Sequence, residues 1–301
     1  MNKLMKIVGG SLAVLVAGAG IAAGAAVLLS EHKMNRVIDV PIESVDFSAY
    51  DPNLERGEYL FVTRGCSECH GTRGEGKVVI DDPSSGLYVH SPNITRGGGG
   101  AAATYSDSDW IALLRHGLKP GRTPAFIMPS EDYAQMADED VVALVSYIRS
   151  MPPSAERKTE MHFPLLMKAL YVAGIAQDAS EKIDHSKVAP TRVPEDTHAQ
   201  GEYISKTCIG CHGPGFSGGQ IPGAPPNWPA AANLTSAPDS VMTTRYASIE
   251  QFRQMMRTGK RPDGTSIGLM PFESLSAMSD SELDALFGFL KTLQPRPSGT
   301  R

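Results

Sequence analysis

The chain contains two copies of one pentapeptide, CSECH at residues 66–70 and CIGCH at residues 208–212. Both follow the pattern C-x-x-C-H, and together they use all four cysteines of the 301-residue sequence. A single pentapeptide of this kind can occur by chance. Two copies that use every cysteine of the chain indicate that both have the same function. The sequence therefore predicts two equivalent sites.

C-x-x-C-H is the attachment signal of a c-type haem, in which two cysteine sulfurs form thioethers and the adjacent histidine becomes the proximal iron ligand. A zinc or structural module built from the two cysteine pairs is an alternative, but about 140 residues between the pairs exceed the spacing of a compact zinc site. We therefore expect two covalently bound haem c groups. The expected attachment residues are Cys66, Cys69, Cys208 and Cys211, and the expected proximal iron ligands are His70 and His212.

The sequence around each motif repeats as well. A shift of 142 positions places Cys66 on Cys208, and Asn93-Ile94-Thr95 matches Asn233-Leu234-Thr235 with a two-residue slip. The same shift of 142 positions also pairs Trp110 with Phe252, Arg115 with Arg257, Gly117 with Gly259, Met128 with Met270 and Met136 with Met278. This number of matches at one shift indicates a duplicated domain.

A methionine downstream of the motif is a common second axial ligand of haem iron in cytochromes c. Met128 and Met270 each lie 58 positions after the motif histidine, and each precedes a proline. The matched spacing predicts that both are iron ligands, although methionine is more often a core residue. The alternative ligands are Met136, His90 and His116 in the first unit and Met278 in the second unit.

Several repeated or loop residues are candidates for contacts with the haem propionates. Asn93, Asn233 and Trp228 lie in loops that can reach a haem edge, with an ordinary loop role as the alternative. Arg115 and Arg257 are either propionate partners or exposed cations at a helix end.

Each unit is expected to contain three helices separated by loops rich in glycine and proline. In the first unit the helices start at Asp51-Pro52, at Ser106 or Asp107, and at Asp138. In the second unit, capping boxes are expected at Ser248 with Gln251 and at Ser279 with Glu282. No segment shows a convincing alternating pattern for a strand.

The N-terminal segment carries a targeting signal. Lys3 and Lys6 precede a run without charge from Ile7 to Leu29, and about 23 helical residues span roughly 34 Å, enough to cross a bilayer. The positive-inside rule places the N-terminus in the cytoplasm and the remaining chain in the periplasm. We expect an uncleaved anchor; a long cleaved signal peptide is the alternative.

The composition limits the class of partner. The formal net charge is −5 and no basic stripe is present, so nucleic acid is not an expected partner. Between the two units, the apolar segment from Phe163 to Ile175 predicts a short amphipathic helix. That helix either packs across the domain boundary or docks on a membrane surface or a partner.

The two motifs, the Asn-Ile/Leu-Thr loops, the Arg-x-Gly helix ends and the Met-Pro pairs resemble the class I cytochrome c superfamily. More narrowly, residues 50–152 and 195–295 resemble the membrane-anchored multihaem cytochrome c subunits of periplasmic dehydrogenases, such as alcohol and gluconate dehydrogenases. Those subunits usually carry three haems, whereas this chain has two motifs. The resemblance implies a mainly α fold, with two tandem class I cytochrome c domains after one transmembrane helix. It implies that Cys66, Cys69, His70 and Met128 hold one haem, and Cys208, Cys211, His212 and Met270 the other.

The expected organisation follows the chain. It comprises an anchor or uncleaved signal (1–30), a tether (31–49), cytochrome c domain 1 (50–152), a linker with a short amphipathic helix (153–194), cytochrome c domain 2 (195–296) and a tail (297–301).

The expected function is electron transfer without catalysis, because an iron with two protein ligands has no open site for a substrate. The chain would be a dihaem cytochrome of the bacterial inner membrane, crossing it once with the haem domains in the periplasm. It would accept electrons from a dehydrogenase or respiratory complex and pass them to an oxidase or cytochrome. The alternative is a dihaem cytochrome c peroxidase, which needs one haem whose sixth position opens; matching methionines in both units argue against that asymmetry.

Overall fold

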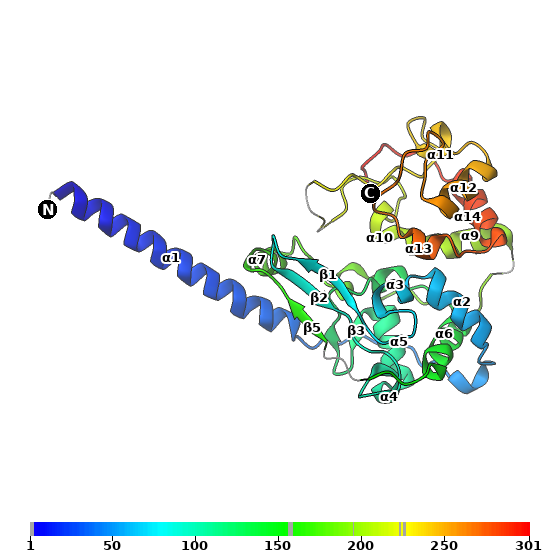
Figure 1. Ribbon diagram of the computed structural model, residues 1–301, viewed down its shortest axis with the longest axis horizontal. Helices are drawn as coiled ribbons and strands as arrows, with labels where there is room; N and C mark the ends of the chain where they lie inside the picture. The colour runs from blue at the N-terminus through cyan, green and yellow to red at the C-terminus, as the bar shows by residue number, and fades with distance from the viewer. Residues whose placement is uncertain (1–2, 156–158, 195, 223, 225–226) are drawn as a thin grey trace.

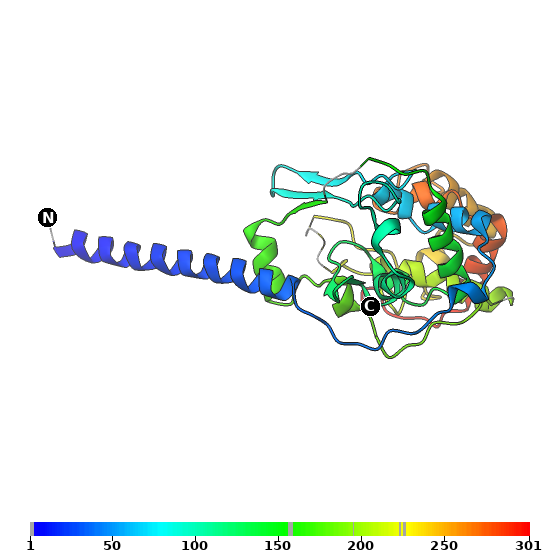
Figure 2. The same ribbon diagram turned by 90° about the horizontal axis from the view of Figure 1, so that it is seen from below.

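A computed structural model describes residues 3–155, 159–194, 196–222, 224 and 227–301. A single long helix projects from a head made of two mostly helical domains (Figures 1 and 2). The long helix, α1, runs over Lys3–Met34, and its segment Ser11–Met34 contains a stretch that is long and apolar enough to cross a membrane. An apolar helix near the N-terminus fits either a signal sequence or an anchor.

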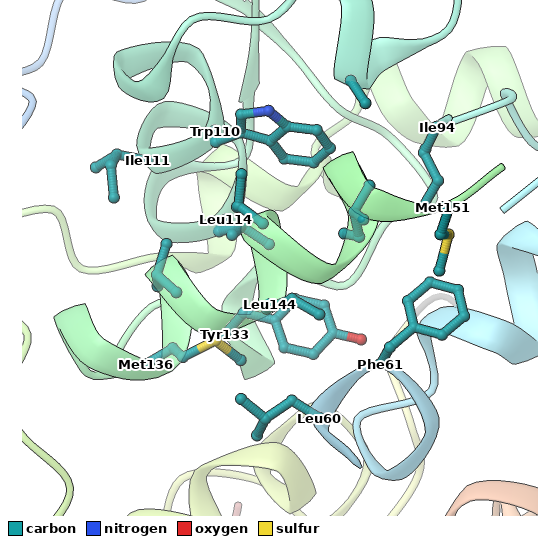
Figure 3. Close-up of a cluster of buried hydrophobic side chains, with 14 residues drawn as sticks. Leu60, Phe61, Ile94, Trp110, Ile111, Leu114, Tyr133, Met136, Leu144 and Met151 are labelled. Atoms are coloured by element: carbon teal, nitrogen blue, oxygen red, sulfur yellow. The ribbon is translucent and has the colours of Figure 1, made fainter. Parts of the chain in front are cut away.

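The first domain is built on three helices, as the sequence predicted. α2 (Leu54–Thr63) packs against α6 (Asp138–Ser150), and α5 (Asp107–His116) completes the core. Shorter helical turns are α3 (Cys66–His70), α4 (Ala101–Thr104), η1 (Phe47–Ala49) and η2 (Ser130–Asp132). The core lies where the three long helices face one another, as Figure 3 shows; it includes Leu60, Phe61, Trp110, Leu114, Tyr133 and Leu144.

The second domain repeats this plan. α9 (Thr197–Ser205) packs against α14 (Asp280–Thr292), with α12 (Ile249–Thr258) as the third long helix. Its core includes Ile204, Phe252, Met256, Leu283, Leu286 and Phe289. The shorter turns are η3 (Lys206–Cys208), α10 (Ile209–His212), α11 (Val241–Thr244) and α13 (Phe272–Leu275).

Glycine makes the main helix crossing of each domain possible. A Cβ added at Gly57 would lie 2.2 Å from the carbonyl oxygen of Ala143, and one at Gly201 would lie 2.0 Å from that of Ala285. Real Cβ atoms do not approach oxygen so closely, so no other residue fits these crossings without moving a helix. The repeated Gly-Glu-Tyr sequence at 57–59 and 201–203 thus has a packing cause.

The structure contains short strands, although no segment of the sequence shows a convincing strand pattern. β1 (Val78–Asp82), β2 (Leu87–His90) and β5 (Glu160–His162) form an antiparallel sheet in the order β1-β2-β5. β3 (Leu118–Lys119) pairs with β4 (Thr123–Pro124). The strands are two to five residues long, too short for a clear alternation, and β5 pairs with β2 from far along the chain.

The helix caps correct two further predictions. The first helix begins at Leu54 and not at Pro52, because Asn53 is the cap and its side chain accepts from the Arg56 amide at 2.9 Å. The capping box at Ser248 and Gln251 is confirmed. The box at Ser279 is only half formed: its hydroxyl accepts from the Glu282 amide, but the Glu282 carboxylate reaches into the first domain.

The contact between the two domains has approximate twofold symmetry. The Tyr59 hydroxyl donates to Glu282 at 2.8 Å and accepts from the Ser279 amide, at the start of α14. The Tyr203 hydroxyl donates to Asp140 at 2.9 Å and accepts from the Ala137 amide, at the start of α6. Each domain therefore caps the third helix of the other with the same tyrosine of its first helix, as in an isologous interface.

Two arginines of the first domain add charge to this contact. Arg64 is buried and pairs with Glu282 at 3.2 Å, and Arg56 lies between Asp140 at 2.9 Å and Glu282 at 3.3 Å. Asp140 of α6 and Glu282 of α14 occupy equivalent positions of the two units. Arg56, which pairs with both, therefore connects the third helix of one domain with that of the other.

The segment between the domains stays with the first domain. The predicted amphipathic helix is confirmed as α7 (Leu165–Val172), and α8 (Ala179–Lys182) follows it. α7 packs on the last turns of α1, and its Tyr171 ring contacts Phe126 of the first domain. The expected packing across the boundary of the two haem-motif domains is therefore not what the structure shows, since α7 contacts α1 and the first domain.

Candidate haem sites

Each C-x-x-C-H motif forms a short helical turn directly after the first helix of its domain. In the first domain, Gly65 adopts a left-handed φ of 79° and turns the chain from α2 into α3. In the second, η3 leads into α10. The helical turn places both cysteines and the histidine of a motif close together, as attachment to one porphyrin requires.

The motif histidines are held in the same way in both domains. His70 Nδ1 lies 3.0 Å from the Pro92 carbonyl oxygen, and His212 Nδ1 lies 2.8 Å from the Ala232 carbonyl oxygen. A carbonyl only accepts, so Nδ1 carries the proton and Nε2 keeps its lone pair for a metal. Burial also lowers the pKa of both imidazoles, which favours the neutral, ligating form.

None of the four cysteines forms a disulfide. Burial raises the pKa of the Cys66 and Cys208 thiols to about 12, and it also raises the pKa of Cys69 and Cys211. The thiols stand here for the sulfur atoms that become thioethers when a haem is attached. Each pair lies in its own domain, and the described residues hold no cluster of three or more His, Cys, Asp or Glu side chains fit for a metal ion. The placement of the two cysteine pairs in different domains argues against a zinc module built from both pairs.

A cavity of about 880 Å³ opens beside the first motif. Among the residues that line it are Cys66, Cys69, His70 and Met128, with Trp110 and Tyr133 of the core. The buried Trp110 Nε1 has no hydrogen-bond partner within the described part of the chain. A buried donor without a partner is costly, and a bound group with acceptor atoms would satisfy it. A largely apolar cavity with two thiols, an imidazole and a thioether fits a haem.

The structure separates the candidate axial ligands of the first domain. Met128 lines the cavity, whereas Met136 is 6% exposed within the hydrophobic core and is not among the lining residues. His116 is turned away: its ring nitrogens lie 3.0 Å from His185 and 2.9 Å from Glu43. His90 does line the cavity, at the end of β2.

In the second domain, the two methionines occupy matching places. Met270 is partly buried and packs against the same hydrophobic cluster as Cys208, while Met278 is 3% exposed inside that cluster. Arg257 donates to the Met278 carbonyl, as Arg115 does to the Met136 carbonyl at 2.8 Å. The repeated arginines thus tie the second helix of each domain to the loop before the third helix. The alternative of an exposed cation at a helix end is excluded for Arg115, which is buried, whereas Arg257 is exposed.

The repeated asparagines have a structural role that the sequence analysis missed. The Asn93 Oδ1 atom accepts from the Thr95 amide and hydroxyl, and Nδ2 donates to the Gly97 and Ser154 carbonyls. Asn233 does the same with Thr235 and the Arg296 carbonyl. The Asn-x-Thr turn therefore fastens each loop to the segment after the third helix. Trp228 is 42% exposed in its loop.

The two motifs meet across the domain interface, a relation that no local pattern revealed. The Gly210 amide, inside the second motif, donates to Asp132 at 3.0 Å, just after the Met128-Pro129 pair. The equivalent of Asp132 in the second domain is Ser274, whose amide and hydroxyl both donate to Glu68 of the first motif. Each methionine loop therefore contacts the haem motif of the other domain. Thr207, Ser274 and Leu275 of the second domain also line the first cavity.

Two family models match the chain, one over each domain. Residues 54–152 match the cytochrome c family, and residues 195–290 match the family described as cytochrome c oxidase, cbb3-type, subunit III. The chain is 27% identical to the fructose dehydrogenase cytochrome subunit of Gluconobacter japonicus over 84% of this chain and 55% of that protein. It is 27% identical to the gluconate 2-dehydrogenase cytochrome c subunit of Pantoea cypripedii over 82% of this chain and 61% of that protein.

A further relative is a dihaem cytochrome c-type protein of Cereibacter sphaeroides, 28% identical over 48% of this chain and 53% of that protein. The chain spans little more than half the length of the dehydrogenase subunits that it matches. The predicted fold is confirmed: the chain consists mainly of helices and contains two cytochrome c domains, and it is a distant homologue of the cytochrome c subunits of membrane-bound dehydrogenases and of dihaem cytochromes.

Proposed function

We propose that this chain is a membrane-anchored dihaem cytochrome that carries electrons from a dehydrogenase or another respiratory complex to a downstream oxidase or cytochrome. One observation supports this most strongly: both domains carry the same set of a C-x-x-C-H turn, a histidine with Nδ1 on a carbonyl, and a Met-Pro pair 58 positions on. Equal sets favour two haems of the same kind over the unequal pair of a peroxidase.

The proposed ligand sets are Cys66, Cys69, His70 and Met128 for the first haem, and Cys208, Cys211, His212 and Met270 for the second. A bound haem c would supply one-electron oxidation and reduction of its iron. The cysteines would fix the group in place, and the Pro92 and Ala232 carbonyls would orient the imidazoles. The thioethers of Met128 and Met270 would favour the reduced state of a bound iron and so raise its reduction potential.

The proposed domain boundaries are residues 50–152 and 195–296 for the cytochrome c domains, with residues 153–194 between them. α1 is proposed as an anchor in the bacterial inner membrane with both domains in the periplasm, because its apolar side chains between Leu12 and Leu29 include many that are exposed. The names of the relatives support a dehydrogenase as the donor.

The test replaces each proposed methionine ligand by alanine in haem-loaded protein. Met128→Ala and Met270→Ala should each abolish the sulfur-to-iron charge-transfer absorbance of one haem and lower that haem's potential. The controls Met136→Leu and Met278→Leu should keep both bands, since these side chains lie in the cores. Loss of a band in a control would overturn the ligand proposal. Rapid carbon monoxide binding to the reduced unaltered protein would favour the peroxidase instead.

A further inference from the structure

The C-terminal end of α1 is joined firmly to the segment between the two domains. Lys33 Nζ donates to the Tyr171 carbonyl at 2.8 Å and lies 4.1 Å from the centre of its ring. Arg36 donates to the Tyr171 hydroxyl at 2.8 Å and pairs with the fully buried Asp178 at 2.7 Å. Charge-assisted hydrogen bonds are stronger than neutral ones, so these contacts hold Tyr171 of α7 against the end of α1.

α7 begins where the exposed apolar surface of α1 ends. Leu28 and Leu29 are exposed, whereas Ser30 is fully buried. Lys168 of α7 approaches Glu31 at 3.7 Å, and Tyr171, one turn later, bonds to Lys33. The residues in contact follow the same order along both helices, so the start of α7 lies on the side of Leu29. Figure 2 shows the segment of α7 at the edge of the head from which α1 emerges.

The outer face of α7 is apolar and uncovered by the rest of the chain. Leu165 is 47% exposed and Leu166 is 69% exposed, and Val172 lies two turns after Leu165 on the same face. Ile175, just beyond the helix, is 62% exposed. The nearest acid before the helix, Glu160, is paired with His162 at 2.8 Å. This surface, Leu165, Leu166, Val172 and Ile175, is here called the α7 face.

We propose that the α7 face lies in the lipid headgroup region of the membrane that α1 crosses, and thereby fixes the orientation of the head on the bilayer. The inference rests on the proposed anchoring by α1. A bilayer is the occupant favoured over a partner protein, because the α7 face continues the uncovered apolar surface of α1 at the level where the spanning segment ends. Amphipathic helices at such interfaces bury their apolar face about 5–10 Å deep.

Docking of the α7 face would determine where the first haem cavity lies relative to the membrane. The cavity is lined not only by the first motif but also by Met34 of α1, Met161 of β5 and Tyr171 of α7. The docked α7 face would hold the first cavity at the membrane surface, with the second domain reached through the interface described above.

Spin labels in haem-loaded full-length protein, reconstituted in phosphatidylethanolamine–phosphatidylglycerol vesicles, test the proposal. The native cysteines are used in haem attachment, so an introduced cysteine is the free thiol for labelling. The reporter is Leu166→Cys. Ile21→Cys reports on α1. Val188→Cys is the matched control, because it is an exposed apolar residue of the same linker and lies close to Pro190, whose carbonyl accepts from the Asp138 amide at the start of α6. The measurement compares relaxation by oxygen, which partitions into lipid, with relaxation by a water-soluble nickel chelate.

The proposal expects the labels at 21 and 166 to favour oxygen, with the label at 166 about 5–10 Å deep in the boundary between headgroups and acyl chains, and the label at 188 to favour nickel. If the label at 21 is exposed to lipid but the labels at 166 and 188 are equally accessible to nickel, the docking of α7 is overturned and the anchor is not. A label at 166 shielded from both reagents would overturn it in favour of a protein partner. Absence of lipid exposure at 21 would overturn the proposed anchor, and the docking with it.

Discussion

Asp132 contacts both candidate haem sites, and its carboxyl group has a raised pKa. It lines the first cavity, bonds to the Gly210 amide of the second motif and follows Glu131. Burial, with a smaller contribution from Glu131, raises the pKa of Asp132 to about 8. A carboxyl that stays protonated in the folded state but ionises on unfolding makes stability depend on pH.

This dependence yields a prediction for Asp132→Asn. Between the pKa of about 3.9 in the unfolded chain and about 8 in the folded one, the folded state binds more protons, so stability falls as pH rises through this window and is level above it. The asparagine keeps an acceptor for Gly210 but does not ionise. It should therefore raise the free energy of unfolding at pH 8 by roughly 1–2 kcal/mol and have little effect at pH 4.

Denaturant unfolding of haem-loaded protein across this pH range measures the effect. Asp39→Asn, at an exposed aspartate, is the control and should keep the slope of the unaltered protein. Equal slopes for Asp132→Asn and the unaltered protein would show that Asp132 is ionised in the folded state.

At the scale of the helix, the crossing of α9 and α14 depends on Gly201. Alanine is the better helix former by about 1 kcal/mol, but its Cβ would lie 2.0 Å from the Ala285 carbonyl oxygen. The clash decides the sign: Gly201→Ala should lower stability by about 2–3 kcal/mol or more.

Gly288→Ala is the matched control in α14, because a Cβ there meets no atom within 4 Å. It should leave stability unchanged or raise it by up to about 1 kcal/mol. Urea unfolding of the two variants, with the visible spectrum of the second domain followed in parallel, compares them. Equal stability of the two variants would contradict the crossing geometry.

The helices were predictable because their signals are local. Ser106, Ser248, Gly117 and Gly259 cap helices by contacts within a few residues, and the structure confirms these ends. The strand β5 was not predictable, because its pairing partner β2 lies about 70 residues away. Likewise the motifs and the methionine spacing were visible in the sequence, whereas the contacts of Asp132 and Ser274 with the opposite motif arise only from domain packing.

At the scale of the whole molecule, Glu282 joins the two domains. Although burial opposes ionisation, the charge of Arg64 and the bond from Tyr59 keep the pKa of Glu282 below its ordinary value. Glu282→Gln would leave the buried Arg64 without its charge partner, and a broken buried pair costs about 3–5 kcal/mol. We expect the two domains to unfold in one transition in the unaltered chain and in two transitions in Glu282→Gln.

Calorimetry of the haem-loaded protein measures this. Glu202→Gln, which removes only the exposed pair with Lys206, should change stability by less than about 1 kcal/mol and keep one transition. A Glu282→Gln profile identical to that of Glu202→Gln would show that the interface does not couple the domains.

The central claim is that each half of this molecule holds one covalently attached haem. Its most direct test is the intact mass of the chain after maturation in a periplasm with cytochrome c assembly, compared with that of a Cys208→Ala, Cys211→Ala variant. The account predicts the polypeptide mass plus two haems for the unaltered chain and plus one for the variant. A bare polypeptide, or an unaltered chain with the same single addition as the variant, would contradict it.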